Sequence, residues 1–100
     1  MRKKQEETKL QKSIQEYLKS LGAYCFKVHG NIYMRAGIPD IIACLDGRFI
    51  GIEVKDGDNT TSQLQEAHGL QIIRAKGIFI VAYSIDDVRK GLIKWEIISK

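Results

Sequence analysis

The sequence predicts a mixed α/β fold in which helices cover a β-sheet, in the order helix, strand, hairpin, helix, strand, helix. Three observations support this prediction. Apolar residues recur at helical spacing near the N-terminus and again after residue 62. Two β-rich runs flank the dipeptide Asp46-Gly47, the strongest short-range hairpin signal. The second helical segment links a strand that ends near Lys55 to one that starts at Ile78, as a crossover connection does.

Residues 7–21 form the first predicted helix, because their apolar side chains fall on one face and Gly22 supplies a stop. Residues 23–29 predict a strand. Ser62 caps the second helix, which continues to about Lys76. The face of this helix that is expected to be buried carries Leu64, His68, Ile72 and Ala75. Residues 78–84 predict a buried strand, and Ser84 with Asp87 resembles a capping box for a short last helix.

The composition is that of one globular domain, residues 1–100, with 44 % hydrophobic and 28 % charged residues. No apolar run approaches the length of a membrane-spanning helix, and the charged N-terminus lacks a signal-peptide core, so we expect an intracellular protein that does not contact membranes. The net charge of +4 fits a polyanionic partner such as nucleic acid. Cys25 and Cys44 form no C-x-x-C pair and are expected to be small buried hydrophobes.

The hairpin fixes which residues face each other. If Asp46-Gly47 is a two-residue loop, Leu45 pairs with Arg48, and counting outwards brings Asp40 opposite Glu53. Lys55, two residues beyond Glu53, lies on the same face of the sheet. Most other positions on both faces are apolar, so the two hairpin strands are expected to be central and covered on both sides.

Two carboxylates and an amine on an apolar sheet have two explanations. In the first, Lys55 simply forms an ion pair with Glu53 at a strand end that solvent reaches. In the second, Asp40 and Glu53 hold Mg²⁺ or Mn²⁺, and the nearby ammonium group stabilises charge on a phosphate or orients a water molecule. The residue pattern by itself leaves both open.

The segment GIPDIIACLDGRFIGIEVK closely resembles the PD-(D/E)xK nuclease signature, with Pro39-Asp40 followed by Glu53-Val54-Lys55. The approach Arg35-x-Gly37-x-Pro39-Asp40 and the later Gln65 are most similar to the virus-type replication–repair nuclease (VRR-Nuc) domain, in its stand-alone phage-type form. The resemblance extends over nearly the whole chain. It implies a restriction-endonuclease-like mixed β-sheet flanked by helices.

The resemblance also implies roles for individual residues. Asp40 and Glu53 would be the metal-binding carboxylates, with the Val54 carbonyl as an extra ligand, Lys55 the catalytic lysine and Gln65 the glutamine that follows the motif. The family has an acidic residue on its first helix, for which Glu7 fits best, since it lies within the apolar stripe, while Gln11 one turn later is an alternative. Lys27 and Arg35 flank the site and are expected to contact the DNA backbone.

The function that the resemblance implies is that of a deoxyribonuclease dependent on Mg²⁺ or Mn²⁺. It would be a structure-specific endonuclease, like Holliday-junction resolvases, that acts on branched or structured DNA as a homodimer in viral or phage replication and repair, in the cytoplasm of the host cell. One alternative is a non-catalytic DNA-binding or assembly module. Another is a nuclease that acts on linear, flap or nicked DNA.

Overall fold

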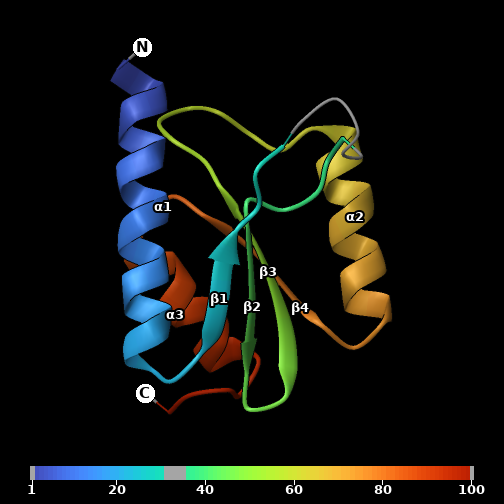
Figure 1. Ribbon diagram of the computed structural model, residues 1–100. Helices are drawn as coiled ribbons and strands as arrows, with labels where there is room; N and C mark the ends of the chain where they lie inside the picture. The colour runs from blue at the N-terminus through green and yellow to red at the C-terminus, as the bar shows by residue number, and fades with distance from the viewer. Residues whose placement is uncertain (1, 31–35, 100) are drawn as a thin grey trace.

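The computed structural model of the protein describes residues 2–30 and 36–99. Its helices are α1 (Arg2–Ser20), α2 (Gln63–Arg74) and α3 (Ile85–Lys94), and its strands are β1 (Tyr24–Lys27), β2 (Ile41–Leu45), β3 (Arg48–Val54) and β4 (Ile78–Ala82). The strands form a four-stranded sheet in the order β1-β2-β3-β4. β1, β2 and β3 run antiparallel, whereas β4 runs parallel to β3, so α2 is the crossover connection that the sequence predicts (Figure 1). The predicted mixed α/β fold and its element order are confirmed.

The hairpin has the predicted register. Leu45 pairs with Arg48 and Ile41 with Ile52. Asp46 and Gly47 have φ values of 52° and 77°, the left-handed conformation that a type I′ turn requires at both central positions. Because side chains alternate along a strand, this register assigns every residue of β2 and β3 to one face of the sheet or the other.

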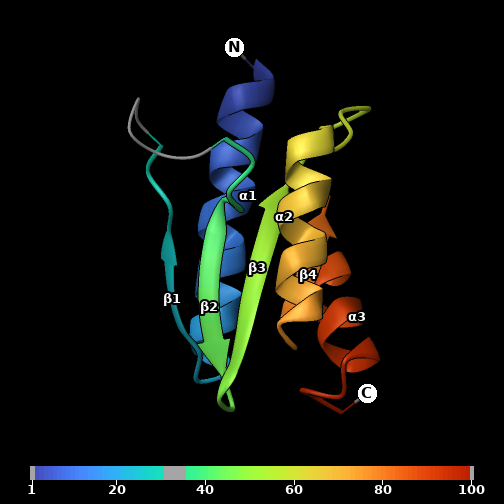
Figure 2. The ribbon, with the colours of Figure 1, turned by 90° about the vertical axis from the view of Figure 1, so that its right-hand side faces the viewer.

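The core lies on one face of the sheet, beneath α1 and α3 (Figures 1 and 2). These two helices contribute Ile14, Leu18, Val88 and Leu92, all fully buried. They pack on the inward-facing positions of the strands, which are Cys25, Ile41, Ala43, Leu45, Ile50, Ile52, Val54, Ile78, Ile80 and Ala82. The apolar positions of the two helices therefore form the core, as their spacing predicts.

The opposite face is covered by α2 over β3 and β4 only. The expectation that both hairpin strands are covered on both sides is therefore wrong for β2. Tyr24, Phe26, Cys44 and Phe49 are exposed on this side, and we call them the open face. A single helix is about 10 Å wide and spans roughly two strands, so β1 and β2 receive no cover from it. Of the two cysteines expected to be buried, Cys25 is buried and Cys44 is exposed.

The element ends differ from the predicted ones at a few positions. α1 starts at Arg2 rather than at residue 7, because Lys, Gln and Glu continue the helix without a breaker. Gly22, with φ 93°, ends α1 as predicted. β1 is shorter than predicted, although the Val28 N–H still donates to the Asp40 carbonyl (2.8 Å). The Ser84 hydroxyl caps α3, but the Asp87 carboxylate accepts from the Tyr83 N–H rather than from Ser84 itself.

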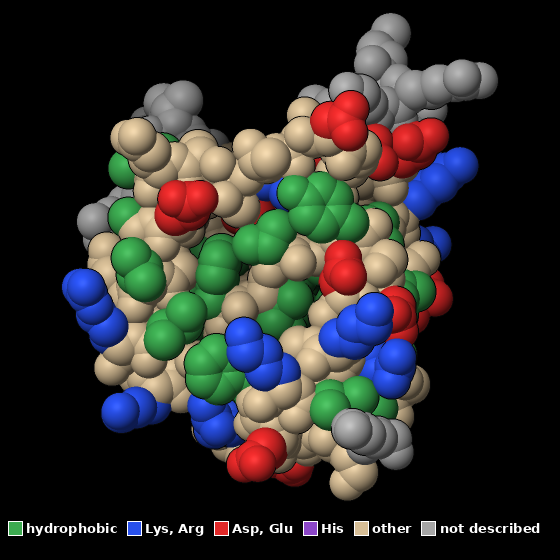
Figure 3. Space-filling view, turned by 180° about the vertical axis from the view of Figure 1, so that it is seen from behind, with side chains coloured by type: hydrophobic (Ala, Val, Ile, Leu, Met, Phe, Trp, Pro, Cys, Tyr) green, Lys and Arg blue, Asp and Glu red, His purple; other side chains and the backbone are tan. Residues whose placement is uncertain are grey.

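A second exposed apolar surface lies around β4, which is an edge strand between α2 and α3 (Figure 2). Seen from behind, apolar side chains gather in a hollow with charged side chains around it (Figure 3). The exposed large apolar residues of this part of the chain are Leu70, Ile73, Tyr83 and Ile85, which we call the edge patch. Within the described residues, no helix is long and apolar enough to cross a membrane.

Candidate active site

The two predicted metal-binding carboxylates lie at the end of the sheet where β2 begins and β3 ends. This end points upwards in Figure 1, between the N-terminal halves of α1 and α2. The ladder pairing stops one residue short of the predicted Asp40–Glu53 pair, because β2 begins at Ile41. Asp40 instead uses its side chain: its Oδ2 accepts a hydrogen bond from the Val54 N–H (2.8 Å). Asp40 is thereby fixed next to Glu53 without being a regular strand residue.

Glu53 is buried, with 2 % of its surface exposed. Its Oε1 accepts a hydrogen bond from Gln65 Nε2 (3.0 Å) on the first turn of α2. Gln65 also belongs to a capping box, since its Oε1 accepts from the Ser62 N–H (2.8 Å) and its own N–H donates to Ser62 Oγ (3.2 Å). Gln65 therefore completes the cap and contacts Glu53 at the same time. The cap fixes the amide, and the amide orients the carboxylate.

The surroundings of Glu53 favour its neutral form. Burial, a hydrogen bond with Asp40 and the charge of Asp40 raise the pKa of Glu53 to about 8 from an ordinary value of 4.5. The bond with Asp40 needs a proton, because two ionised carboxylates have no donor to share. Without that proton, Glu53 Oε2 is a buried oxygen with no hydrogen-bond partner among the described residues.

Two more predicted site residues act on the same carboxyl group. The ammonium group of Lys55 lowers the pKa of Glu53 and the carboxylate of Glu7 raises it, so both lie within electrostatic reach. Lys55 follows the last residue of β3, where its N–H donates to the Ala82 carbonyl (3.0 Å). The fold thus brings Glu7, Asp40, Glu53, Lys55 and Gln65 to one end of the sheet from four separate segments of the chain.

Of the two residues predicted to contact DNA, the structure describes Lys27. Lys27 is the last residue of β1 and is paired with Ile41, next to Asp40. It is half-buried at the same end of the sheet. Arg35 lies outside the described residues.

The segment that leads into Asp40 packs against α2. Gly37 has φ 88°, and a Cβ there would lie 2.7 Å from the Leu64 carbonyl carbon and oxygen. Only glycine fits this position without strain. Leu64 itself was predicted to face the core, but 55 % of its surface is exposed, since the inward side of α2 carries Gln65, His68, Gly69 and Ile72.

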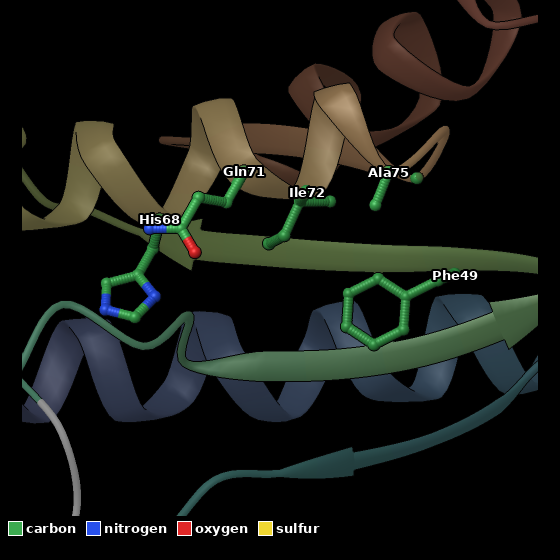
Figure 4. Close-up of a pocket in the computed structure, with 6 residues that line it drawn as sticks. Phe49, His68, Gln71, Ile72 and Ala75 are labelled. Atoms are coloured by element: carbon green, nitrogen blue, oxygen red, sulfur yellow. The ribbon is translucent and has the colours of Figure 1, made fainter.

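A groove along α2 has a mostly apolar lining. It has a volume of about 330 Å³, runs between α2 and β3, and is lined by Phe49, His68, Gln71, Ile72, Ala75 and Gly77 (Figure 4). His68 is half-buried at the end of this groove, whereas its place on the apolar side of the helix predicts burial in the core. No carboxylate lines the groove, so it is not part of the acidic site.

The donor set at the sheet end fits a hard divalent cation. Two carboxylates meet there, and Glu53 Oε2 lacks a partner among the described residues when both acids are ionised. Among residues 2–30 and 36–99, no three His, Cys, Asp or Glu side chains gather closely enough to bind a metal by themselves. Asp40 and Glu53 are therefore the residues that can hold such an ion, and Glu7 lies farther out.

The mixed sheet carries two carboxylates and a lysine at the end of its central hairpin. No protein-family model matches the sequence, and no curated protein matches it. Among solved structures, a VRR_NUC domain superposes with a TM-score of 0.72 at 27 % identity, over 88 % of this chain and 94 % of the other. The resemblance to VRR-Nuc domains is thus confirmed at the level of the fold.

Two further solved structures share this fold. A VRR_NUC domain protein has a TM-score of 0.68 at 21 % identity, over 89 % of this chain and 88 % of the other. Hjc, a Holliday junction resolvase from the archaeal hyperthermophile Archaeoglobus fulgidus, has a TM-score of 0.61 at 21 % identity, over 77 % of this chain and 67 % of the other. The chain has the fold of VRR_NUC domain proteins and of a Holliday junction resolvase.

Proposed function

We propose that this protein is a metal-dependent endonuclease that hydrolyses phosphodiester bonds in DNA and prefers branched or structured substrates. The observation that carries the proposal is the pair of adjacent carboxylates, Asp40 and buried Glu53, with Lys55 and Gln65 beside it. A buried pair of carboxylates that repel each other destabilises the fold, and a non-catalytic DNA-binding module would gain nothing from it. The structural neighbour Hjc is a Holliday junction resolvase, which supports the preference for junctions.

Each residue has a distinct part in the proposed reaction. Asp40 and Glu53, with the Val54 carbonyl, would hold Mg²⁺ or Mn²⁺, and the bound ion would supply positive charge for the scissile phosphate and acidify a water molecule. The Val54 N–H fixes Asp40, and Gln65 fixes Glu53, so the donor oxygens are oriented before the ion arrives. Lys55 donates hydrogen bonds to the attacking water or to the phosphate oxygens. Glu7 adds negative charge at the cation, and Lys27 and Arg35 contact the DNA backbone.

We also propose that the protein acts as a homodimer, because symmetric cleavage of two strands needs two sites related by a two-fold axis. A standard interface buries about 800 Å² on each partner. The exposed large apolar side chains of the open face and the edge patch are consistent with such burial.

The function is tested by incubating the full chain with labelled junction, flap, nicked and linear duplex DNA in Mg²⁺ or Mn²⁺. We expect junction cleavage that EDTA abolishes. Lys55→Ala should lower the cleavage rate by at least about 100-fold, the scale of one electrostatic donor. It should leave the Mn²⁺ affinity close to wild type, because an ammonium group is not a ligand.

Lys12→Ala, at an exposed position of α1, is the matched control and should cleave like wild type. Undiminished cleavage in EDTA, or near-wild-type turnover by Lys55→Ala, would contradict the proposed mechanism. Equal rates on linear duplex and on junctions would retain the nuclease but contradict the substrate preference.

A further inference from the structure

Gln11 stands out on the buried side of α1. It lies one turn after Glu7 and is 8 % exposed. In the described part of the chain, two buried side-chain oxygens lack a hydrogen-bond partner, and these are Gln11 Oε1 and Glu53 Oε2. Core residues of the same helix, such as Ile14 and Leu18, are apolar. An amide at this position therefore needs an explanation that packing does not provide.

An unpartnered buried acceptor destabilises the folded protein, because it loses its hydrogen bonds to water and gains none in return. A methionine or leucine would fill much the same space without this cost. Buried polar groups of native proteins almost always have a partner in the protein, in ordered water or in a bound ion. The partner of Gln11 Oε1 is then a donor that lies outside the described residues.

The geometry of α1 directs Gln11 towards the acidic site. Helical side chains lean towards the N-terminus, so the Gln11 side chain extends over the turn that carries Glu7. Glu7 lies within electrostatic reach of Glu53. The two unpartnered oxygens thus flank the same end of the sheet, and both are acceptors. A water molecule has two protons to donate, and a divalent cation held by only two carboxylates retains several waters.

We propose that Gln11 is a positioning residue for the metal centre, whose Oε1 accepts a hydrogen bond from a water molecule of the hydrated cation held by Asp40 and Glu53. This inference rests on the proposed metal-dependent function and deepens it. Its consequence is that the first helix contributes an uncharged acceptor as well as the Glu7 carboxylate. Such outer contacts typically change metal affinity by 10- to 100-fold.

The test compares Mn²⁺ binding by the full-length wild type and its variants, measured by electron paramagnetic resonance and calorimetry without DNA. Gln11→Met removes the acceptor at similar volume and should raise the Mn²⁺ Kd at least about tenfold. Gln11→Glu retains an acceptor oxygen and should stay within about threefold of wild type or bind more tightly. Gln15→Met, the same change one turn further along α1, is the matched control and should bind like wild type.

Thermal melting in EDTA supplies a second readout. Because Gln11→Met removes an unpartnered oxygen, it should melt at or above the wild-type temperature. A glutamine needed only for packing would give the reverse pattern, with a lower melting temperature and an unchanged Mn²⁺ Kd, and that result would overturn the inference. So would a Gln11→Glu variant that folds and loses Mn²⁺ binding. If the wild type itself binds no Mn²⁺, the proposed function fails and this inference fails with it.

Discussion

The carboxyl group of Glu53 occupies a place where an ionised group is unfavourable in the metal-free protein. It is buried, and the charge of Asp40 acts on it, while Lys55 and the Gln65 amide favour its charged form. A divalent cation between the two acids would reverse this balance, because it attracts both carboxylates and supplies Glu53 Oε2 with a partner. The stability of the metal-free protein should therefore report on the site directly.

The first prediction concerns the pH dependence of stability in EDTA. Since the pKa of Glu53 is about 8 in the folded protein and 4.5 ordinarily, the folded protein binds more protons between these values than the unfolded chain does. Its free energy of unfolding is then largest below the lower value and falls as the pH rises towards about 8. Melting temperatures measured in EDTA at about pH 5, 6.5 and 8 should decrease in that order.

Asp40→Asn is the informative variant for this measurement. It keeps an oxygen for the Val54 N–H but removes the charge beside Glu53. Near pH 8 in EDTA it should melt above wild type by roughly 4–8 °C, the shift for about 1 kcal/mol. Its pH slope should be smaller but not zero, because burial persists. Added Mg²⁺ should stabilise wild type more than the variant.

Asp58→Asn, at an exposed position, is the control and should leave the melting temperature and its pH slope unchanged. Identical pH slopes for Asp40→Asn and wild type would mean that the two acids do not interact.

At the scale of elements, three local features place the candidate site residues at one end of the sheet. The Asp46-Gly47 turn sets the register of β2 and β3 and thereby the distance of Asp40 from Glu53. The capping box at Ser62 aims Gln65 at Glu53. The close approach of Gly37 to Leu64 fixes the segment that enters the site at Asp40.

The close approach at Gly37 gives the second prediction. Gly37→Ala places a Cβ 2.7 Å from backbone atoms of Leu64, at a φ of 88° that alanine adopts with strain. The variant should lose about 1–3 kcal/mol of stability and melt several degrees lower. Because the displaced segment ends at Asp40, its cleavage rate should fall as well.

Gly30→Ala is the matched control, since no atom of the described residues lies within 4 Å of a Cβ there and its φ is not in the left-handed region. It should melt and cleave within error of wild type, or slightly above it in melting temperature. Equal melting temperatures for the Gly37 and Gly30 variants would show that the segment is not held against α2.

At the scale of the whole molecule, the sheet has helices on one complete face and on half of the other. α1 and α3 seal the core side, whereas α2 leaves the open face uncovered and β4 with a free edge. For a chain of 100 residues, this leaves much apolar surface in contact with water. A second copy of the chain is the proposed cover.

The third prediction is a particle of twice the chain mass of 11.4 kDa, measured by light scattering at micromolar concentration. Ile73→Glu charges the edge patch and Phe26→Glu charges the open face, and one of the two should produce a monomer. The other variant serves as its control and should remain dimeric. A wild-type monomer that still cleaves junctions would contradict the proposed dimer.

The sequence by itself determined those features that depend on short-range geometry. A two-residue Asp-Gly turn and the two-residue period of a strand are sufficient to place Asp40 near Glu53, and the three-residue spacing of a capping box places Gln65 near Ser62. The family resemblance then supplied what these residues could do together. The spacing of Leu10, Ile14 and Leu18 was sufficient to give α1 a buried face.

Only the tertiary structure decided which surfaces are covered, because the position of a helix over a sheet depends on the packing of all the layers at once. An apolar pattern does not say how many strands one helix can cover, so Cys44 and Leu64 were assigned to the wrong environment. Nor does a pattern distinguish a glutamine on the rim of a helix face from one sealed against a sheet. Gln11 is buried, and its Oε1 has no hydrogen-bond partner among the described residues, because of how α1 packs against the sheet.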